Sequence, residues 1–170
     1  MHPMAQDPQH HALPEVPEMP DRVPADHEVA AGAIAGLAGA AAMAFAAIVF
    51  AENGSLFPLR LVAASMLGHE ALDPVSIGPV MLGIALGALA AVVLGLLFAS
   101  ILPRGYGTSN ALGAGLAFGA AAWAITWWGP LRILDPVLFA AVASSDMLFL
   151  DLLFGAVAGL AMPPLRRALP

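Results

Sequence analysis

The chain has 170 residues, of which 60% are hydrophobic and only 11% are charged, and its mean hydropathy is +0.85. A soluble protein needs roughly a quarter of its residues charged to cover its surface, so most of this surface must face something other than water. The net charge of −6 argues against nucleic acid as a partner, and the absence of cysteine excludes disulfides, thiolate metal sites and iron–sulfur clusters.

Residues 1–28 form a segment that is acidic and contains six prolines. A secretory signal begins with a basic stretch followed at once by an apolar core, so this segment is not expected to be one. Its composition does not allow a buried core, and its prolines favour an extended path. We therefore expect an extended, Pro-rich cytoplasmic tail.

Four apolar runs follow, and each is long enough, or nearly so, to cross about 30 Å of hydrocarbon as a helix. The third run follows a turn at residues 105–110, and the fourth is expected to end at Pro163 and Pro164. The predicted fold is an all-α four-transmembrane-helix bundle over residues 29–162, followed by a short basic C-terminus over 163–170. The predicted spans are residues 29–50, 80–102, 111–128 and 148–162, and an alternative start for the fourth is Ala140, which would include Asp146 in the span.

The arginines predict the orientation of these spans, because positively charged loops stay in the cytoplasm. With the N-terminus inside, four arginines are cytoplasmic and only Arg60 and Arg132 are outside. We therefore expect a multi-pass protein of the inner (cytoplasmic) membrane with both termini in the cytoplasm. All carboxylates after residue 28 then lie on the outer side, where they would attract a basic soluble partner such as a cytochrome c: Glu52, Glu70, Asp73, Asp135, Asp146 and Asp151.

The two halves of the chain resemble each other. Pro58-Leu59-Arg60 recurs as Pro130-Leu131-Arg132, Asp73-Pro74-Val75 recurs as Asp135-Pro136-Val137, and the Ala/Gly-rich run 35–43 is echoed by 114–123. These echoes predict two repeated helical hairpins related by an axis along the membrane normal. Each Asp-Pro pair is expected to start a short helix, with Asp as N-cap and Pro at the first helical position.

Each span also carries a pair of glycines four residues apart. In lipid, close backbone approach at such pairs supplies much of the association between helices, so these residues predict tight packing within the bundle: Gly32, Gly36, Gly83, Gly87, Gly115, Gly119, Gly155 and Gly159.

His69, Glu70 and Asp73 are the residues that most resemble a metal site. On a helix His69 and Asp73 would share a face, and an imidazole with a carboxylate can bind a transition metal. A metal site needs three or four ligands, however, and every other histidine lies in the tail. We therefore predict a polar turn at the membrane surface and no metal.

Asp151 is an ionisable residue near the outer end of the fourth span, and such a residue is a functional hypothesis by default. Pairing with Arg132 or Arg60 is the favoured interpretation, and proton or ion handling is the alternative. In the third span Trp127 and Trp128 are predicted to be interfacial anchors.

The body of the chain resembles small, Gly-rich, four-helix bacterial inner-membrane proteins of unknown function. The likeness rests on Pro58-Leu59-Arg60-Leu61-Val62-Ala63-Ala64 with Leu67-Gly68, on Gly95-Leu96-Leu97-Phe98-Ala99, on Gly115-Leu116-Ala117-Phe118-Gly119 with Trp123, and on Leu152-Leu153-Phe154-Gly155 with Gly159. It implies the four-helix architecture and names no activity. A histidine is expected in the second and fourth helices of that group, at the positions of Gly87 and Asp151 here.

No catalytic constellation can be assembled from these residues, and a haem would need an axial histidine within a span. We therefore expect no enzyme activity and no cofactor of its own. The predicted function is a non-catalytic accessory subunit, embedded in the lipid bilayer among the other subunits of a respiratory or other energy-converting membrane complex with electron transport. The alternative is a small homo-oligomeric transporter or channel, since transporters often consist of internal repeats.

Overall fold

The computed structural model describes residues 25–51, 54–129 and 136–169, which form helices joined by turns and loops and contain no strand. Four of the described helices are long and apolar enough to cross a membrane: α1 (Ala25–Val49), α3 (Gly78–Ile101), α4 (Thr108–Trp128) and α7 (Ser144–Ala168). The shorter elements are α2 (Phe57–Leu67), the 3-10 helix η1 (Gly68–Leu72) and α6 (Pro136–Ala141). The predicted all-α fold with four long apolar helices is confirmed, whereas the tail over residues 1–24 lies outside the described residues.

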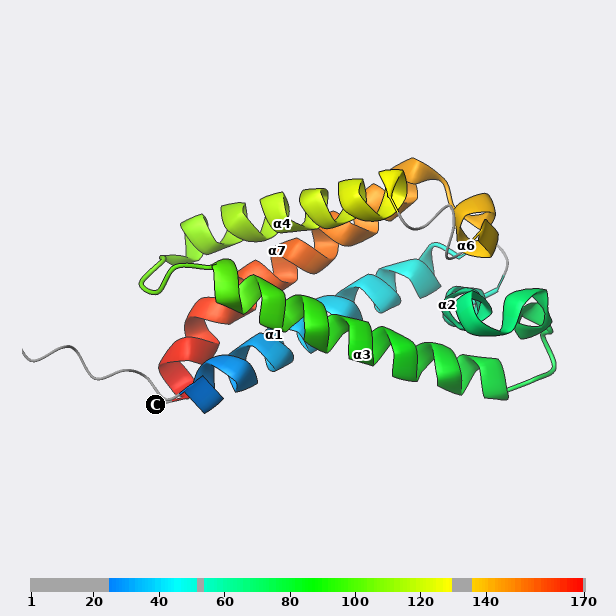
Figure 1. The fold of residues 1–170 in the computed structure, drawn as a ribbon, viewed down its shortest axis with the longest axis horizontal. Helices are drawn as coiled ribbons and strands as arrows, with labels where there is room; N and C mark the ends of the chain where they lie inside the picture. Colours follow the sequence, from blue (N-terminus) through cyan, green and yellow to red (C-terminus); the bar gives the residue numbers. More distant parts are fainter. Residues whose placement is uncertain (1–24, 52–53, 130–135, 170) are drawn as a thin grey trace, which may run out of the picture.

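Several of the helix ends differ from the prediction. Residues 25–28 belong to α1 rather than to the tail, and α4 begins at Thr108 instead of 111, where the Gly107 carbonyl accepts the N–H of Ala111 at 3.0 Å. The largest difference is in α7, which starts at Ser144 and continues through Pro163 and Pro164 to Ala168. Proline normally interrupts a helix by removing a hydrogen-bond donor. Here α7 instead changes direction in its last turns (Figure 1).

The long helices form a row in the order α3, α1, α7 and α4, in which α1 packs against both α3 and α7 (Figure 1). They alternate in direction, so the start of α1, the end of α3, the start of α4 and the end of α7 lie together. We call this the terminal end of the bundle. At the opposite end, α2 lies against α3 and contacts α6 and α1; we call this the α2–α6 end.

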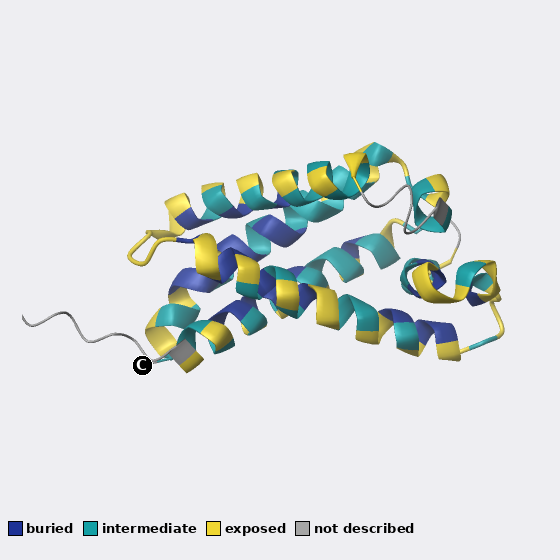
Figure 2. Ribbon diagram, in the orientation of Figure 1, coloured by how far each residue is buried: buried dark blue, intermediate teal, exposed yellow. Residues whose placement is uncertain are grey.

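The core of the bundle is made mostly of small side chains near the terminal end. Its largest fully buried side chains are Phe98 and Met162, and the Phe98 ring of α3 lies 5.3 Å from the Phe118 ring of α4. The outward faces of α3 and α4 are exposed (Figure 2) and carry large apolar residues such as Leu89, Val93 and Ile125. An exposed apolar belt of this kind suits contact with lipid.

Glycines bring the helices of each hairpin to backbone contact. A Cβ atom on Gly36 of α1 would fall on the Ala91 carbonyl oxygen of α3 and 2.9 Å from the Gly95 Cα atom. In the other hairpin, a Cβ atom on Gly119 of α4 would fall on the Asp151 carbonyl oxygen of α7. The same kind of contact exists between long helices at six further glycines: Gly32, Gly39, Gly95, Gly115, Gly155 and Gly159.

The glycine pair of α3 behaves differently from the other three. Gly83 lies against the Leu59 backbone of α2 rather than against a long helix, and a Cβ atom on Gly87 would meet nothing within 4 Å. Gly87 is therefore not a close contact between the described helices. The glycine of α3 that contacts α1 is Gly95, which does not belong to the predicted pair.

The connections at the α2–α6 end agree only partly with the expected Asp-Pro helix starts. Asp73 is not an N-cap, because η1 has already ended at Leu72 and the Asp73 Oδ1 atom accepts the N–H of Val75 at 3.0 Å. This is a local turn of the kind that aspartate often forms. α6 begins at Pro136 as expected, while Asp135 and the repeated Pro130-Leu131-Arg132 lie outside the described residues.

Candidate functional site

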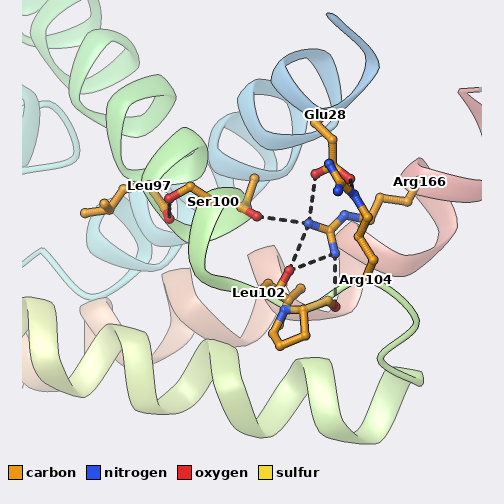
Figure 3. Close-up of polar contacts among 8 residues, drawn as sticks. Glu28, Leu97, Ser100, Leu102, Arg104 and Arg166 are labelled. Carbon is orange, nitrogen blue, oxygen red and sulfur yellow. Dashed lines mark hydrogen bonds and ion pairs between the residues drawn. The ribbon is translucent and has the colours of Figure 1, made fainter. Parts of the chain in front are cut away.

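A cluster of three charged residues lies at the terminal end of the bundle (Figure 3). Glu28 belongs to the first turn of α1, Arg104 to the loop between α3 and α4, and Arg166 to the last turn of α7. The Glu28 Oε1 atom accepts the Arg104 Nε–H at 3.0 Å, and its Oε2 atom accepts an Arg166 Nη2–H at 2.9 Å. An acid at a helix start and a cation at a helix end also suit the helix dipoles. We call these residues the terminal cluster.

Arg166 also completes the end of α3. Its Nη2 atom donates to the carbonyl oxygens of Ala99 at 2.9 Å and Leu102 at 3.2 Å, and its Nη1 atom donates to those of Leu102 at 3.2 Å and Pro103 at 3.4 Å. The last carbonyls of a helix have no partner within it, and the planar guanidinium offers several donors to them at once. One side chain of α7 therefore holds the ends of α1 and α3.

The members of the cluster differ in exposure. The side chains of Glu28 and Arg166 are 17% and 16% exposed, whereas that of Arg104 is 68% exposed. Within the described part of the chain, Arg104 engages only its Nε atom, with Glu28. Its terminal nitrogens have no hydrogen-bond partner among the described residues.

Two neighbouring cavities adjoin the terminal cluster, and Glu28, Arg104 and Arg166 line both of them. The larger has a volume of about 430 Å³, and its other lining residues are Ser100 and the apolar Val29, Leu96, Ala99, Ile101, Leu102 and Pro103. The smaller has a volume of about 190 Å³ and adds His27, Gly105 and Leu169. The His27 Nδ1 and Arg166 Nε atoms are buried without a hydrogen-bond partner among the described residues. Two guanidinium groups against one carboxylate give the cluster an excess of positive charge, which favours an anion.

Asp151 does not pair with Arg60 in the described part of the chain. Arg60 Nη2 instead donates to the Pro74 carbonyl oxygen at 2.8 Å, while Asp151 Oδ2 is buried without a hydrogen-bond partner there. The other predicted partner, Arg132, lies outside the described residues. Because α7 begins at Ser144, Asp151 is about 10 Å along the helix from its start, deeper than the sequence suggested.

His69, Glu70 and Asp73 are all exposed at the α2–α6 end. η1 ends before Asp73, so His69 and Asp73 do not share one continuous helix. The described residues contain no group of three or more possible ligands that could hold a metal ion.

Two of the tryptophans link elements at the same end. The Trp123 Nε1 atom donates to the Ser144 carbonyl oxygen at 3.1 Å, which joins α4 to the start of α7. The Trp127 ring lies 4.7 Å from that of Phe139 in α6. The interfacial role of Trp127 and Trp128 stays a prediction.

No family model, curated protein or solved structure matches the chain. The resemblance to small, Gly-rich membrane proteins therefore stays a prediction. The two positions at which it expects a histidine lie apart in the chain's packing, since Gly87 faces open space and Asp151 lies against Gly119.

Sequence reasoning missed the terminal cluster. It used Arg104 and Arg166 only as orientation signals and placed Glu28 in the tail. A signal was nevertheless present, because an arginine follows the second and the fourth apolar runs and an acid precedes the first. With the helices alternating in direction, these three residues must meet at one end.

Proposed function

We propose that the chain is a non-catalytic accessory subunit of a larger membrane protein complex, of the respiratory or other energy-converting kind. The observation that carries the proposal is at α4, an outer helix of the row. Gly113 of α4 is exposed, and a Cβ atom there would meet nothing within 4 Å. Small residues allow close approach of helices in lipid, so α4 offers a place for a transmembrane helix of another subunit.

The polar contacts of the described residues support a structural role. Arg60, Trp123 and Arg166 donate to backbone carbonyl oxygens of other elements. They join α2 to the loop before α3, α4 to α7, and α7 to α3. Their role in this proposal is to hold the helices at fixed positions.

We further propose that the two hairpins are repeats of one unit, related by an axis along the membrane normal. The glycine contacts support this, because Gly32 and Gly36 meet Ala91, Gly95 and Ala99 much as Gly115 and Gly119 meet Asp151, Gly155 and Gly159. The correspondence between the two hairpins does not extend to the contacts between them, since α1 packs closely on α7 whereas α3 and α4 make few direct contacts. In this correspondence Asp151 stands where the first hairpin has Ala91.

Co-purification tests the proposal. The chain, extracted from its native membrane in a mild detergent, is expected to migrate with other membrane subunits. Gly113→Leu should remove partners without unfolding the bundle, because a Cβ atom at this exposed position meets no described atom within 4 Å. Ala41→Leu, at an exposed small residue of the inner helix α1, is the matched control and should keep every partner. A chain that migrates only with copies of itself would contradict the proposal.

The tail provides a second variant for the same assay. Its acids would bind arginine or lysine on a neighbouring subunit, and its prolines lower the cost of ordering it. Deletion of residues 1–24 stops before α1 and keeps Glu28, so the bundle should remain folded while partners are lost. A truncated chain that keeps all its partners would exclude a role for the tail in binding.

A small homo-oligomeric transporter is the second candidate, and the buried Oδ2 atom of Asp151, which has no hydrogen-bond partner among the described residues, favours it. The test is proton or cation flux into liposomes that contain the purified chain. A flux that Asp151→Asn abolishes would support the transporter. Equal flux with and without the protein would exclude it.

A further inference from the structure

The larger cavity of the terminal end has the features of a lipid site. We propose that it holds the phosphate group of an anionic phospholipid, with Arg104 as the cation that binds the phosphate. The volume of about 430 Å³ lies within the range of ligand sites, roughly 300–1,000 Å³. Basic pockets between transmembrane helices are a known way of binding anionic headgroups.

The charges around the cavity leave Arg104 as the binding group. Both carboxylate oxygens of Glu28 are already engaged, one with Arg104 and the other with Arg166. Both terminal nitrogens of Arg166 are engaged as well, with Glu28 and the carbonyls at the end of α3. Arg104, in contrast, is fixed by a single bond at Nε, with its outer nitrogens facing no described partner. A guanidinium held in this way can form two parallel hydrogen bonds to a phosphate.

The apolar part of the lining identifies the source of the phosphate as a lipid. Val29 and Ile101 both line the cavity and are 54% and 59% exposed. Val29 is in the second turn of α1 and Ile101 is the last residue of α3. Both therefore lie at the ends of helices that are long and apolar enough to cross a membrane, and the headgroups of a bilayer lie at the ends of such helices. A phospholipid at this depth would place its phosphate beside Arg104 and its acyl chains along the exposed Ile101 and Leu97. A soluble anion would gain nothing from this apolar wall.

The test measures stabilisation of the purified full-length chain in a neutral detergent. Phosphatidylglycerol, phosphatidylcholine with the same acyl chains, and inorganic phosphate are titrated separately while thermal unfolding is followed. Phosphatidylglycerol should raise the unfolding temperature at a lower concentration than the other two. Arg104→Gln should raise its half-saturating concentration roughly tenfold or more, since a hydrogen bond to a charged group is lost.

Three further variants separate binding from folding. Arg104→Lys keeps the charge and should keep the preference for phosphatidylglycerol. Ser100→Phe should abolish the preference, because it fills the cavity and leaves the terminal cluster intact. Arg167→Gln is the matched control, since Arg167 is an exposed neighbour of Arg166 that lines neither cavity, and it should behave as the unmodified chain does.

Three results would overturn the proposal. Equal stabilisation by phosphatidylcholine and phosphatidylglycerol would mean that the site does not recognise the charge of the headgroup. Inorganic phosphate as effective as phosphatidylglycerol would assign the site to a soluble anion. An undiminished preference in both Arg104→Gln and Ser100→Phe would place the bound lipid elsewhere on the chain.

Discussion

The two glycines Gly113 and Gly115 of α4 give a direct test of the packing between helices. They lie two residues apart in one helix, so Gly→Ala changes the intrinsic helix propensity in the same direction at both, by about 1 kcal/mol in favour of alanine. Their surroundings are opposite. A Cβ atom on Gly113 would meet nothing within 4 Å, whereas one on Gly115 would fall on the Gly155 carbonyl oxygen and 3.1 Å from the Gly159 Cα atom.

The expected cost at Gly115 follows from these contacts. The atoms that a new methyl group would meet are backbone atoms of α7, which have no rotamer by which to move away. Carbon atoms prefer a separation of about 3.5–4.0 Å, so the two helices would have to separate. Overpacking of this kind costs about 1–3 kcal/mol. Gly115→Ala should therefore be less stable than Gly113→Ala by about that amount.

Reversible unfolding of the purified chain in mixed micelles, with increasing SDS, measures the two free energies of unfolding. Gly113→Ala should be as stable as the unmodified chain or slightly more stable, and Gly115→Ala should be clearly less stable. Free energies that agree within about 0.5 kcal/mol, the usual scatter of surface substitutions, would refute backbone contact between α4 and α7.

The remaining predictions concern orientation and charge. Cysteines introduced at Ser76 and Ser145, at the α2–α6 end, should react with an impermeant thiol reagent from outside the cell while one at Ser109 should not; the opposite labelling pattern would reverse the orientation. Arg166→Met should lower the free energy of unfolding by about 1–3 kcal/mol, because Glu28 and the end of α3 lose their partner. Arg167→Met, measured by the same unfolding assay, should change it by less than about 0.5 kcal/mol, and equal effects would exclude the capping role. Glu70→Gln together with Asp73→Asn should slow association with a basic soluble protein at low salt in stopped-flow measurements, and an unchanged rate would mean that these exposed carboxylates attract no partner.

The long helices could be predicted from the sequence because apolar runs of this length have few other uses. Their ends could not be predicted as well, since proline and polar residues were treated as stops. α7 continues past Pro163 and Pro164, and in its last turn Arg166 is held by contacts with α1 and α3. Tertiary contacts, which no local pattern contains, here outweigh the local preference against proline.

The glycine pairs predict the contacts between helices only in part. The pairs in α1, α4 and α7 lie at contacts between long helices. In α3 the pair is Gly83 and Gly87, but the glycine that contacts α1 is Gly95. The small residues that α3 presents to α1 are Ala91, Gly95 and Ala99, a pattern that includes alanine at the outer positions. The face of a helix that is covered depends on the partner helix, and the sequence of the helix itself does not specify that partner.

The contacts within the terminal cluster could not be predicted from the sequence for a related reason. Glu28 lies 76 positions from Arg104 and 138 positions from Arg166, and only the alternating directions of the helices bring them together. Charge alone could predict that these residues share one side of the membrane. It could not predict that a single carboxylate joins both arginines.

The packing also bears on the choice between the two proposed functions. Transport by alternating access requires some helices to separate from others. Backbone contacts hold α1 to α3 and α4 to α7, and Arg166 holds the terminal end of α7 to that of α3. The two hairpins meet where α1 packs on α7, and there a Cβ atom on Gly39 would lie 2.8 Å from the Phe154 carbonyl oxygen. Every neighbouring pair of long helices in the row is therefore in close contact at a glycine. Separation of any such pair would break these contacts, which favours the accessory subunit over the transporter.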